Sequence, residues 1–249
     1  MIRILKKKNC CGCGACVQKC PKSCIKFQID EEGFFFSFLD ERLCVNCGLC
    51  EKVCPILSPL SINTPISTYA LKNTKERIRM ESSSGGVFSL MAEDIINDGG
   101  VVFGAKFDEK WQVVIGFTET IKGIVDFRGS KYVQSRIDNS YKDCEKFLKQ
   151  GRKVLFSGTP CQIAGLRNFL KKSYPLLYTV DIICHGVPSP KVWWLYLNEI
   201  LKDEATKNDS SISIESIKKI EFRNKQEGWR KYHFVLTFEE ICGRDKKQV

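Results

Sequence analysis

Residues 10–21 read CCGCGACVQKCP and decide the fold of the first part of the chain. Four of their cysteines, followed by a proline, have the spacing CxxCxxCxxxCP, and these are Cys10, Cys13, Cys16 and Cys20. The same spacing returns in CVNCGLCEKVCP, where the cysteines are Cys44, Cys47, Cys50 and Cys54. Bacterial ferredoxins bind 4Fe-4S clusters with this run, so two copies predict a small ferredoxin-type module with two clusters.

The ligands of each cluster are expected to come from both runs, because the fourth cysteine of a ferredoxin run binds the other run's cluster. The first cluster is therefore predicted to bind Cys10, Cys13, Cys16 and Cys54, and the second Cys44, Cys47, Cys50 and Cys20. Two four-thiolate zinc sites are the alternative, but these usually read as CxxC pairs separated by a longer span. Cys11 and Cys24 lie outside the runs and are expected to pack beside the clusters.

The composition is that of an ordinary globular protein. The chain has 249 residues, 43% of them hydrophobic and 27% charged, which suits one large domain or a small and a medium one. Ten of its fourteen cysteines precede residue 55. No secretory signal or membrane-spanning run is recognisable, so we expect a cytoplasmic protein that is not integral to a membrane. In that compartment the cysteines are expected to serve metal or redox chemistry.

Local patterning divides the chain into three regions. Residues 25–40 (IKFQIDEEGFFFSFLD) alternate apolar and polar side chains on either side of a Glu-Gly pair, which predicts a β-hairpin. Residues 1–57 are assigned to the two-cluster module, whose core is small enough that the clusters are expected to supply much of its stability. Residues 58–68 (SPLSINTPIST) are predicted to form a linker.

Residues 69–249 alternate strand-like and helix-like stretches. Strands are predicted at 101–107, 111–118, 154–158 and 178–184, and helical patterns follow the last two. Strand followed by helix predicts an α/β domain with a mixed, partly parallel sheet, in which ligands sit at the carboxyl ends of strands. Two further strands, within 217–222 and 231–238, are predicted to be antiparallel.

One loop of this domain is a candidate phosphate site. The stretch ESSSGG (81–86) precedes a helical pattern. Free backbone NH groups, hydroxyls and the positive end of the helix dipole suit a phosphate there. A plain N-cap is the alternative.

Two other loops carry reactive side chains. In SGTPCQ (157–162), Thr159 and Pro160 predict a helix start, and Cys161 in its first turn is predicted to be either rich in thiolate or a small buried residue. In CHGVPSP (184–190), His185 either positions a cofactor or caps a strand. The chain has two histidines, which excludes a His-rich metal site.

In combination, these stretches resemble the coenzyme F420 hydrogenase/dehydrogenase beta-subunit family. The resemblance is carried by the two cysteine runs and by SSSGGVFSLM (82–91), GSKYVQS (129–135), GTPCQIAGLR (158–167), DIICHGVPSP (181–190) and FRNKQEGW (222–229). Members are iron-sulfur flavoproteins that pass electrons between clusters, a flavin and a second redox partner. The resemblance therefore implies a flavin, FAD or another, in the α/β domain, with coenzyme F420 as a candidate substrate.

The resemblance also implies a set of flavin-binding residues, although it assigns no catalytic residue. The set is Ser83, Ser84, Gly85, Gly86, Lys131, Tyr132, Gln134, Thr159, Cys161 and Gln162. The serine-glycine loop is expected at the phosphates and the others along the site. For Lys131 a solvated surface cation is the alternative.

The C-terminus departs from the family pattern. Members usually continue into a segment with further cysteines, where another cluster is often bound, whereas this chain ends ICGRDKKQV. The α/β domain is accordingly expected to be incomplete, and a third cluster bound by Cys161 and Cys184 lacks partners. Cys144 and Cys242 are single cysteines that follow no metal-binding pattern.

The sequence thus predicts an iron-sulfur flavoprotein oxidoreductase that passes electrons between two 4Fe-4S clusters, a flavin and a small-molecule or deazaflavin partner. The alternatives are a non-catalytic ferredoxin-type subunit that docks on a partner enzyme and, third, an iron-sulfur sensor. The net charge of +10 and the basic stretch RILKKK (3–8) favour an acidic redox partner protein or an anionic substrate. No nucleic-acid-binding motif accompanies the charge, so nucleic acid is not an expected partner.

Overall fold

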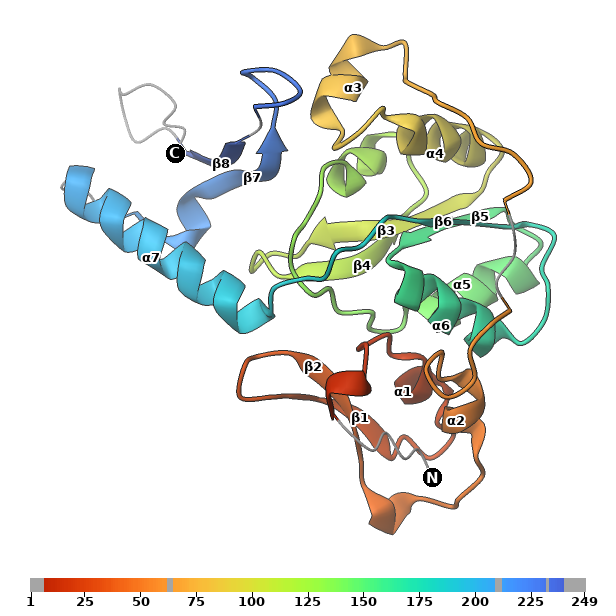
Figure 1. Cartoon of the computed structure of the whole chain (residues 1–249). Coiled ribbons are helices and arrows are strands. Elements are labelled where there is room, and N and C mark those ends of the chain that lie inside the picture. Colours follow the sequence, from red (N-terminus) through yellow and green to blue (C-terminus); the bar gives the residue numbers. More distant parts are fainter. Residues whose placement is uncertain (1–6, 62–64, 209–211, 232, 240–249) are drawn as a thin grey trace.

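The computed structural model describes residues 7–61, 65–208, 212–231 and 233–239 (Figure 1). Its first part, drawn in red and orange, is a small module below the rest of the molecule. The elements of this module are η1 (Lys7–Asn9), α1 (Ala15–Lys19), β1 (Ile25–Ile29), β2 (Phe35–Leu39), η2 (Glu41–Leu43) and α2 (Leu49–Val53). Strands β1 and β2 pair in antiparallel register, as the alternation of residues 25–40 predicts.

Helices α1 and α2 reproduce the repeat of the two cysteine runs. Gly14 and Gly48 precede them with φ of 72° and 70°, a left-handed conformation that favours glycine. Both helices are followed by an extended cysteine, Cys20 and Cys54, which stands directly before a proline. A residue before proline avoids the helical region, so the proline of each run limits its helix to about one turn.

The α/β part contains a four-stranded sheet and a separate hairpin. Its elements are α3 (Glu76–Glu81), α4 (Val87–Asn97), β3 (Val101–Phe107), β4 (Val113–Thr118), η3 (Lys122–Phe127), α5 (Ser140–Lys149), β5 (Val154–Gly158), α6 (Pro160–Leu170), β6 (Leu177–Asp181), α7 (Pro190–Asn208), η4 (Ile214–Ser216), β7 (Ile217–Asn224) and β8 (His233–Phe238). The sheet order is β4-β3-β5-β6, with β3, β5 and β6 parallel and β4 antiparallel. The predicted mixed sheet and the predicted antiparallel pair β7-β8 are confirmed.

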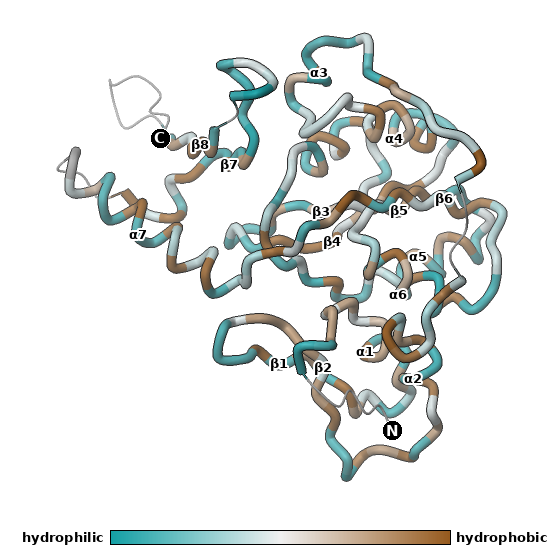
Figure 2. Tube along the Cα trace, viewed as in Figure 1, coloured by the Kyte–Doolittle hydropathy of each residue, from teal (hydrophilic) through white to brown (hydrophobic). Residues whose placement is uncertain are grey.

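Successive side chains of the central strands point to opposite faces of the sheet, and both faces are buried. Phe103 and Phe156 point into the cluster that contains α5 and α6, whereas Val102 and Leu155, one residue away, point into the cluster of α4. Figure 2 shows the resulting apolar colouring along β3 and β5. Strands buried on both faces read as continuous apolar runs, which is why these were recognisable from sequence.

The iron-sulfur module shares a hydrophobic core with the α/β part. Residues of both runs, including Cys13 and Cys16, belong to the same buried cluster as Leu166 of α6. Tyr141 of α5 is fully buried, and its hydroxyl lies 2.8 Å from the carbonyl oxygen of Cys13. The Gln18 Oε1 atom accepts a hydrogen bond from the backbone NH of Tyr141 at 3.1 Å. The module is therefore packed in a defined orientation against α5 and α6.

Several elements were not predicted. Helices α3 and α5 are rich in charged side chains, and α5 buries only Ser140, Tyr141, Cys144 and Leu148, so its apolar pattern is weak in sequence. Strand β6 ends at Asp181, earlier than the predicted 184, and residues 182–184 are exposed. Within the described residues, no helix has the length and apolarity needed to cross a bilayer. Cys242 and part of the basic stretch 3–8 lie outside the described residues.

Gly14 and Gly48 occupy equivalent positions before α1 and α2. Variants at these two positions can therefore show how much the packing of the module on the α/β part contributes to stability. A Cβ atom on Gly14 would collide with Ile137 of the α/β part, whereas one on Gly48 would meet nothing within 4 Å. Both alanine variants carry the left-handed penalty of about 1–2 kcal/mol. Gly14→Ala should lose about 1–3 kcal/mol more, the typical cost of overpacking. Anaerobic denaturant unfolding of the two variants checks this, and equal losses would contradict the described packing.

Candidate iron-sulfur and cofactor sites

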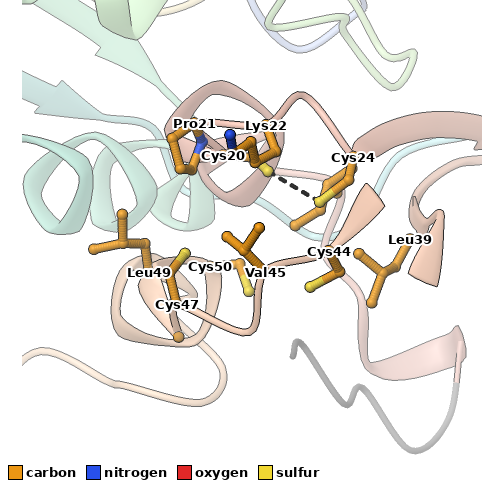
Figure 3. Close-up of a pocket in the computed structure, with 12 residues that line it drawn as sticks. Cys20, Pro21, Lys22, Cys24, Leu39, Cys44, Val45, Cys47, Leu49 and Cys50 are labelled. Atoms are coloured by element: carbon orange, nitrogen blue, oxygen red, sulfur yellow. Dashed lines mark hydrogen bonds between the residues drawn. The ribbon is translucent and has the colours of Figure 1, made fainter. Parts of the chain in front are cut away.

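Two cavities in the module are lined by cysteines from both runs. One has in its lining Cys10, Cys13, Cys16 and Cys54. The other has in its lining Cys20, Cys44, Cys47 and Cys50 (Figure 3). Each cavity thus combines three cysteines of one run with the fourth of the other, the grouping expected from the crossed ligand pattern. The assignment of individual ligands stays a prediction.

The grouping follows from the way the two short helices pack. Helices α1 and α2 contact each other, and Ala15 and Val53 between them are fully buried. Cys20 and Cys54, at the helix ends, therefore reach the cavity formed by the other run. Four thiolates around a cavity of this kind fit a cubane cluster, whose protein ligands are cysteines.

The two cavities differ in what surrounds them. Exposed residues line both cavities: Val45 and Cys47 in the second, and Ile56 in the first. The cavity of the first run lies against α6, where a Cβ atom added to Gly165 would come within 3.1 Å of the Sγ atom of Cys13. The first cavity is therefore the one adjacent to the α/β part.

Cys11 and Cys161 connect these two parts of the protein. Their thiols are hydrogen-bonded to each other, and Cys11 also interacts with Cys13. The bond with Cys11, together with burial, raises the pKa of Cys161 above its ordinary range. Of the two interpretations given for Cys161, the raised pKa disfavours the thiolate-rich one, because a thiol partner and burial outweigh the helix N-terminus.

Residues 129–135 connect the other stretches on which the family resemblance depends. The Ser130 hydroxyl lies 2.7 Å from that of Ser83 in the serine-glycine loop. Ser135 accepts a hydrogen bond of 2.8 Å from the Gln162 amide, and the backbone NH of Gln134 donates to the carbonyl of Pro188 at 3.0 Å. We call residues 129–135 the central segment. It brings together motifs that are far apart in sequence.

Gln134 also joins the central segment to the iron-sulfur module. Its Oε1 atom accepts from the backbone NH of Phe35 at 2.7 Å, and its Nε2 atom donates to the carbonyl of Phe35 at 3.0 Å. The side-chain amide thereby pairs with β2 as a neighbouring strand residue would. Its two polar atoms are engaged inside the protein, so a direct flavin contact through them would have to replace these bonds.

The serine-glycine loop at the start of α4 leaves one hydroxyl available. Ser82 donates to the carbonyl of Ile78 at 2.7 Å, and Ser83 pairs with the central segment. Ser84 is exposed, and its hydroxyl has no hydrogen-bond partner within the described part of the chain.

Gly86 has φ of 77° at the N-cap of α4, and a Cβ atom on Gly85 would lie 2.6 Å from the Leu71 carbonyl. Both glycines therefore have local structural roles as well.

Lys131 and Tyr132 differ in their surroundings. The Nζ atom of Lys131 donates to the backbone carbonyls of Asp126, Arg128 and Gly129 at 2.8, 2.9 and 3.4 Å. Burial lowers the pKa of Lys131 to about 7. Tyr132 is 41% exposed, and its ring packs edge-on against Phe222. Tyr132 thus remains accessible, whereas Lys131 mainly holds the loop that precedes it.

The loop between β5 and α6 is held by its own polar groups. The Oε1 atom of Gln162 accepts from the backbone NH of Thr159 at 3.0 Å, as a capping residue does. The Thr159 hydroxyl lies 3.1 Å from the Sγ atom of Cys161. Gln162 is buried, so it shapes the loop from within. Cys184 and His185, in contrast, are exposed beyond the end of β6.

Sequence reasoning about single loops missed the basic side chains beside the serine-glycine loop. Lys225, from the turn between β7 and β8, is only 3% exposed and donates to the carbonyls of Arg79 and Ser82. Burial and the nearby charges of Arg223 and Arg79 lower the pKa of Lys225. Its position within FRNKQEGW was the only sequence signal. An electropositive surrounding with an exposed serine fits an anionic phosphate group, so the residues present are compatible with a flavin nucleotide.

Two family models match parts of this chain. Residues 151–243 match the family model for the C terminus of the coenzyme F420 hydrogenase/dehydrogenase beta subunit, and residues 9–56 match that of the 4Fe-4S dicluster domain. The coenzyme F420-dependent sulfite reductase of Methanocaldococcus jannaschii is 27% identical over 252 residues, which cover 94% of this chain and 38% of that protein. A chain in the xenon-derivatized F420-reducing NiFe hydrogenase complex of Methanosarcina barkeri is 22% identical, with a TM-score of 0.46 over 76% of this chain and 63% of that one.

The dicluster match and the two cysteine cavities define an iron-sulfur protein with a 4Fe-4S dicluster domain. The match over residues 151–243 covers the second half of the α/β part. Residues 151–243 of the chain therefore resemble the C terminus of the coenzyme F420 hydrogenase/dehydrogenase beta subunit, the family that the sequence motifs indicate. The chain spans 38% of the length of the curated relative that it matches.

The lowered pKa of Lys131 predicts a pH-dependent stability. Between about pH 7, its value in the folded protein, and its ordinary 10.5, the unfolded chain binds this proton and the folded one does not. The free energy of unfolding therefore rises with pH across that window. Urea unfolding under anaerobic conditions should show that, between about pH 6.5 and 9.5, the free energy of unfolding of the wild type increases relative to that of Lys131→Met. A wild-type advantage that stays constant or shrinks would contradict a buried, partly neutral lysine.

Proposed function

We propose that this protein is an iron-sulfur flavoprotein oxidoreductase in which the α/β part binds a flavin beside the first cluster. The observation that carries the proposal is the central segment, which contacts the serine-glycine loop, the loop at the start of α6, the Pro188 loop and strand β2. These contacts gather the stretches that define the family at one edge of the sheet. Ligands of α/β sheets bind at such an edge, beyond the carboxyl ends of parallel strands.

The proposed cofactor residues fall into two groups. The exposed Ser84, with the NH groups at the start of α4 and the basic Lys225 nearby, is proposed to bind the phosphates. Tyr132 and the loop of Thr159 and Cys161 are proposed to line the rest of the site. Gln134, Gln162 and Lys131 are proposed to hold these elements in place through the bonds described above. A bound flavin supplies the exchange between one-electron and two-electron chemistry.

The two cysteine sets are proposed to have different roles in electron transfer. Cys10, Cys13, Cys16 and Cys54 would hold the cluster next to α6, where Cys11 and Cys161 are in contact. Cys20, Cys44, Cys47 and Cys50 would hold the cluster nearer to solvent. We therefore propose that electrons exchange with a redox partner protein at the second cluster and with the flavin at the first.

The substrate is proposed at the level of its class. The matched relative is named for dependence on coenzyme F420, a deazaflavin, so a deazaflavin or another small two-electron carrier is the proposed partner of the flavin. Residues 1–57 are proposed as the electron-transfer domain, 58–68 as the linker and 69–249 as the flavin-binding domain. Redox proteins or further oxidoreductase subunits are the proposed macromolecular partners.

A non-catalytic electron-transfer subunit is the second candidate. It is favoured by the internal bonds of Gln134, Gln162 and Lys131, which give these side chains structural roles that need no cofactor. In that case the α/β part would be a scaffold that docks the clusters onto a partner enzyme. Flavin content distinguishes the two candidates.

The phosphate assignment predicts that flavin and iron can be separated by mutation. Ser84→Trp places a bulky ring at the exposed position of the loop without removing an internal hydrogen bond. The flavin affinity should fall by roughly tenfold or more, which corresponds to about 1.4 kcal/mol, while iron content is unchanged. Absorption spectra and chemical iron analysis of the same anaerobic sample measure both.

Ser82→Ala is the matched control, because the Ser82 hydroxyl bonds to Ile78 within the protein. This variant should retain flavin. Wild-type flavin affinity in Ser84→Trp would contradict the phosphate site, and wild-type protein without any flavin would favour the non-catalytic subunit.

A further inference from the structure

The second cysteine cavity contains one thiol more than a four-ligand cluster uses. Besides its four assigned cysteines, Cys24 lines the same cavity (Figure 3). The Sγ atom of Cys24 lies 3.2 Å from that of Cys20, and the residue is only 4% exposed. Two sulfur atoms at this separation, facing one cavity, can serve the same coordination position in turn.

The chain between these cysteines explains their proximity. Residues 20–24 form a tight turn, in which the backbone NH of Ser23 donates to the carbonyl of Cys20 at 3.2 Å. Ser23 has φ of 50°, and the turn returns Cys24 to the side of Cys20 at the start of β1. The backbone of Cys24 is fixed there, since its carbonyl accepts from the NH of Asp40 at 2.8 Å. Pro21 and Lys22 are exposed, so the turn has room to relax while the Cys24 side chain rotates.

The other run provides an internal comparison. The residue four places after its last cysteine is Ser58, which corresponds to Cys24 in the repeat. The Ser58 hydroxyl donates to the carbonyl of Glu51 at 3.0 Å. The position that could replace Cys54 therefore carries a hydrogen-bonded hydroxyl instead of a thiol. The first cavity also has a spare thiol in its lining, Cys11, which is hydrogen-bonded to Cys161 of α6.

We propose that Cys24 is an alternative ligand of the second cluster that can replace Cys20. The inference rests on the proposed function in one respect, the assignment of this cavity to a 4Fe-4S cluster. In the exchange, the iron–sulfur bond to Cys20 breaks and one to Cys24 forms. The thiol proton of Cys24 passes to the released thiolate of Cys20, so charge and electron count are unchanged. The second cluster thus has a spare thiol beside its fourth cysteine, whereas the equivalent position beside Cys54 is Ser58.

Four variants test the exchange in anaerobically purified full-length protein. They are Cys20→Ala, Cys24→Ser, the Cys20→Ala/Cys24→Ser double variant and Cys54→Ala. Iron content and the EPR spectrum in the oxidised state are measured, because a cubane that lacks one thiolate loses iron or converts to a paramagnetic three-iron form. Cys20→Ala and Cys24→Ser should keep the wild-type iron content and give no three-iron signal. The double variant and Cys54→Ala should each lose iron or show that signal.

Comparison of the single and double variants tests whether Cys24 replaces Cys20 as a ligand. If Cys20→Ala alone loses iron to the same extent as the double variant, Cys24 does not replace Cys20. If the double variant keeps two intact cubanes, a solvent ligand is sufficient and the inference is wrong. A wild type with only one cubane would instead contradict the assignment of the cavity, which separates failure of the proposed function from failure of this inference.

A kinetic measurement covers the case in which Cys20→Ala does not fold. Cys24→Ser retains all four assigned ligands, so it is expected to fold as the wild type does. Iron release to a chelator should nevertheless be several-fold faster in Cys24→Ser, since a transiently released iron can no longer be recaptured by a second thiol. Equal release rates in the wild type and Cys24→Ser would contradict the reserve ligand.

Discussion

The contact of the first cysteine run with helices α5 and α6 is the constraint on which the rest of the structure depends. At its centre the buried Tyr141 hydroxyl lies 2.8 Å from the carbonyl oxygen of Cys13 and 2.9 Å from that of Gln162. Burial raises the pKa of Tyr141 well above its ordinary value, so the hydroxyl stays a neutral hydrogen-bond donor. One side chain thereby fixes a cluster loop relative to the loop that starts α6.

This contact gives the two cavities different surroundings. Cys13 of the first cavity lies next to Gly165 of α6, whereas the lining of the second cavity includes the exposed Val45 and Cys47. A ferredoxin module that packs on a larger domain in this way has one cluster site next to that domain. The near-identical cysteine runs could not supply this asymmetry by themselves.

Features with a local cause were predictable from sequence. Cysteine spacing defines the dicluster module, alternation defines the β1-β2 hairpin, and continuous apolar runs define the buried strands β3 and β5. Features with a distant cause were not predictable. The thiol of Cys161 depends on Cys11, and the amide of Gln134 depends on Phe35, both at the other end of the fold. No spacing rule reports such pairs, because they exist only after the module has docked.

The central claim is that one chain holds two cubanes beside a flavin. Iron, acid-labile sulfide and flavin, quantified on a single anaerobically purified sample, test it most directly. Two 4Fe-4S clusters and one flavin predict about eight iron, about eight sulfide and one flavin per chain. About four iron, or full iron content without flavin even after incubation with FAD, would contradict the account.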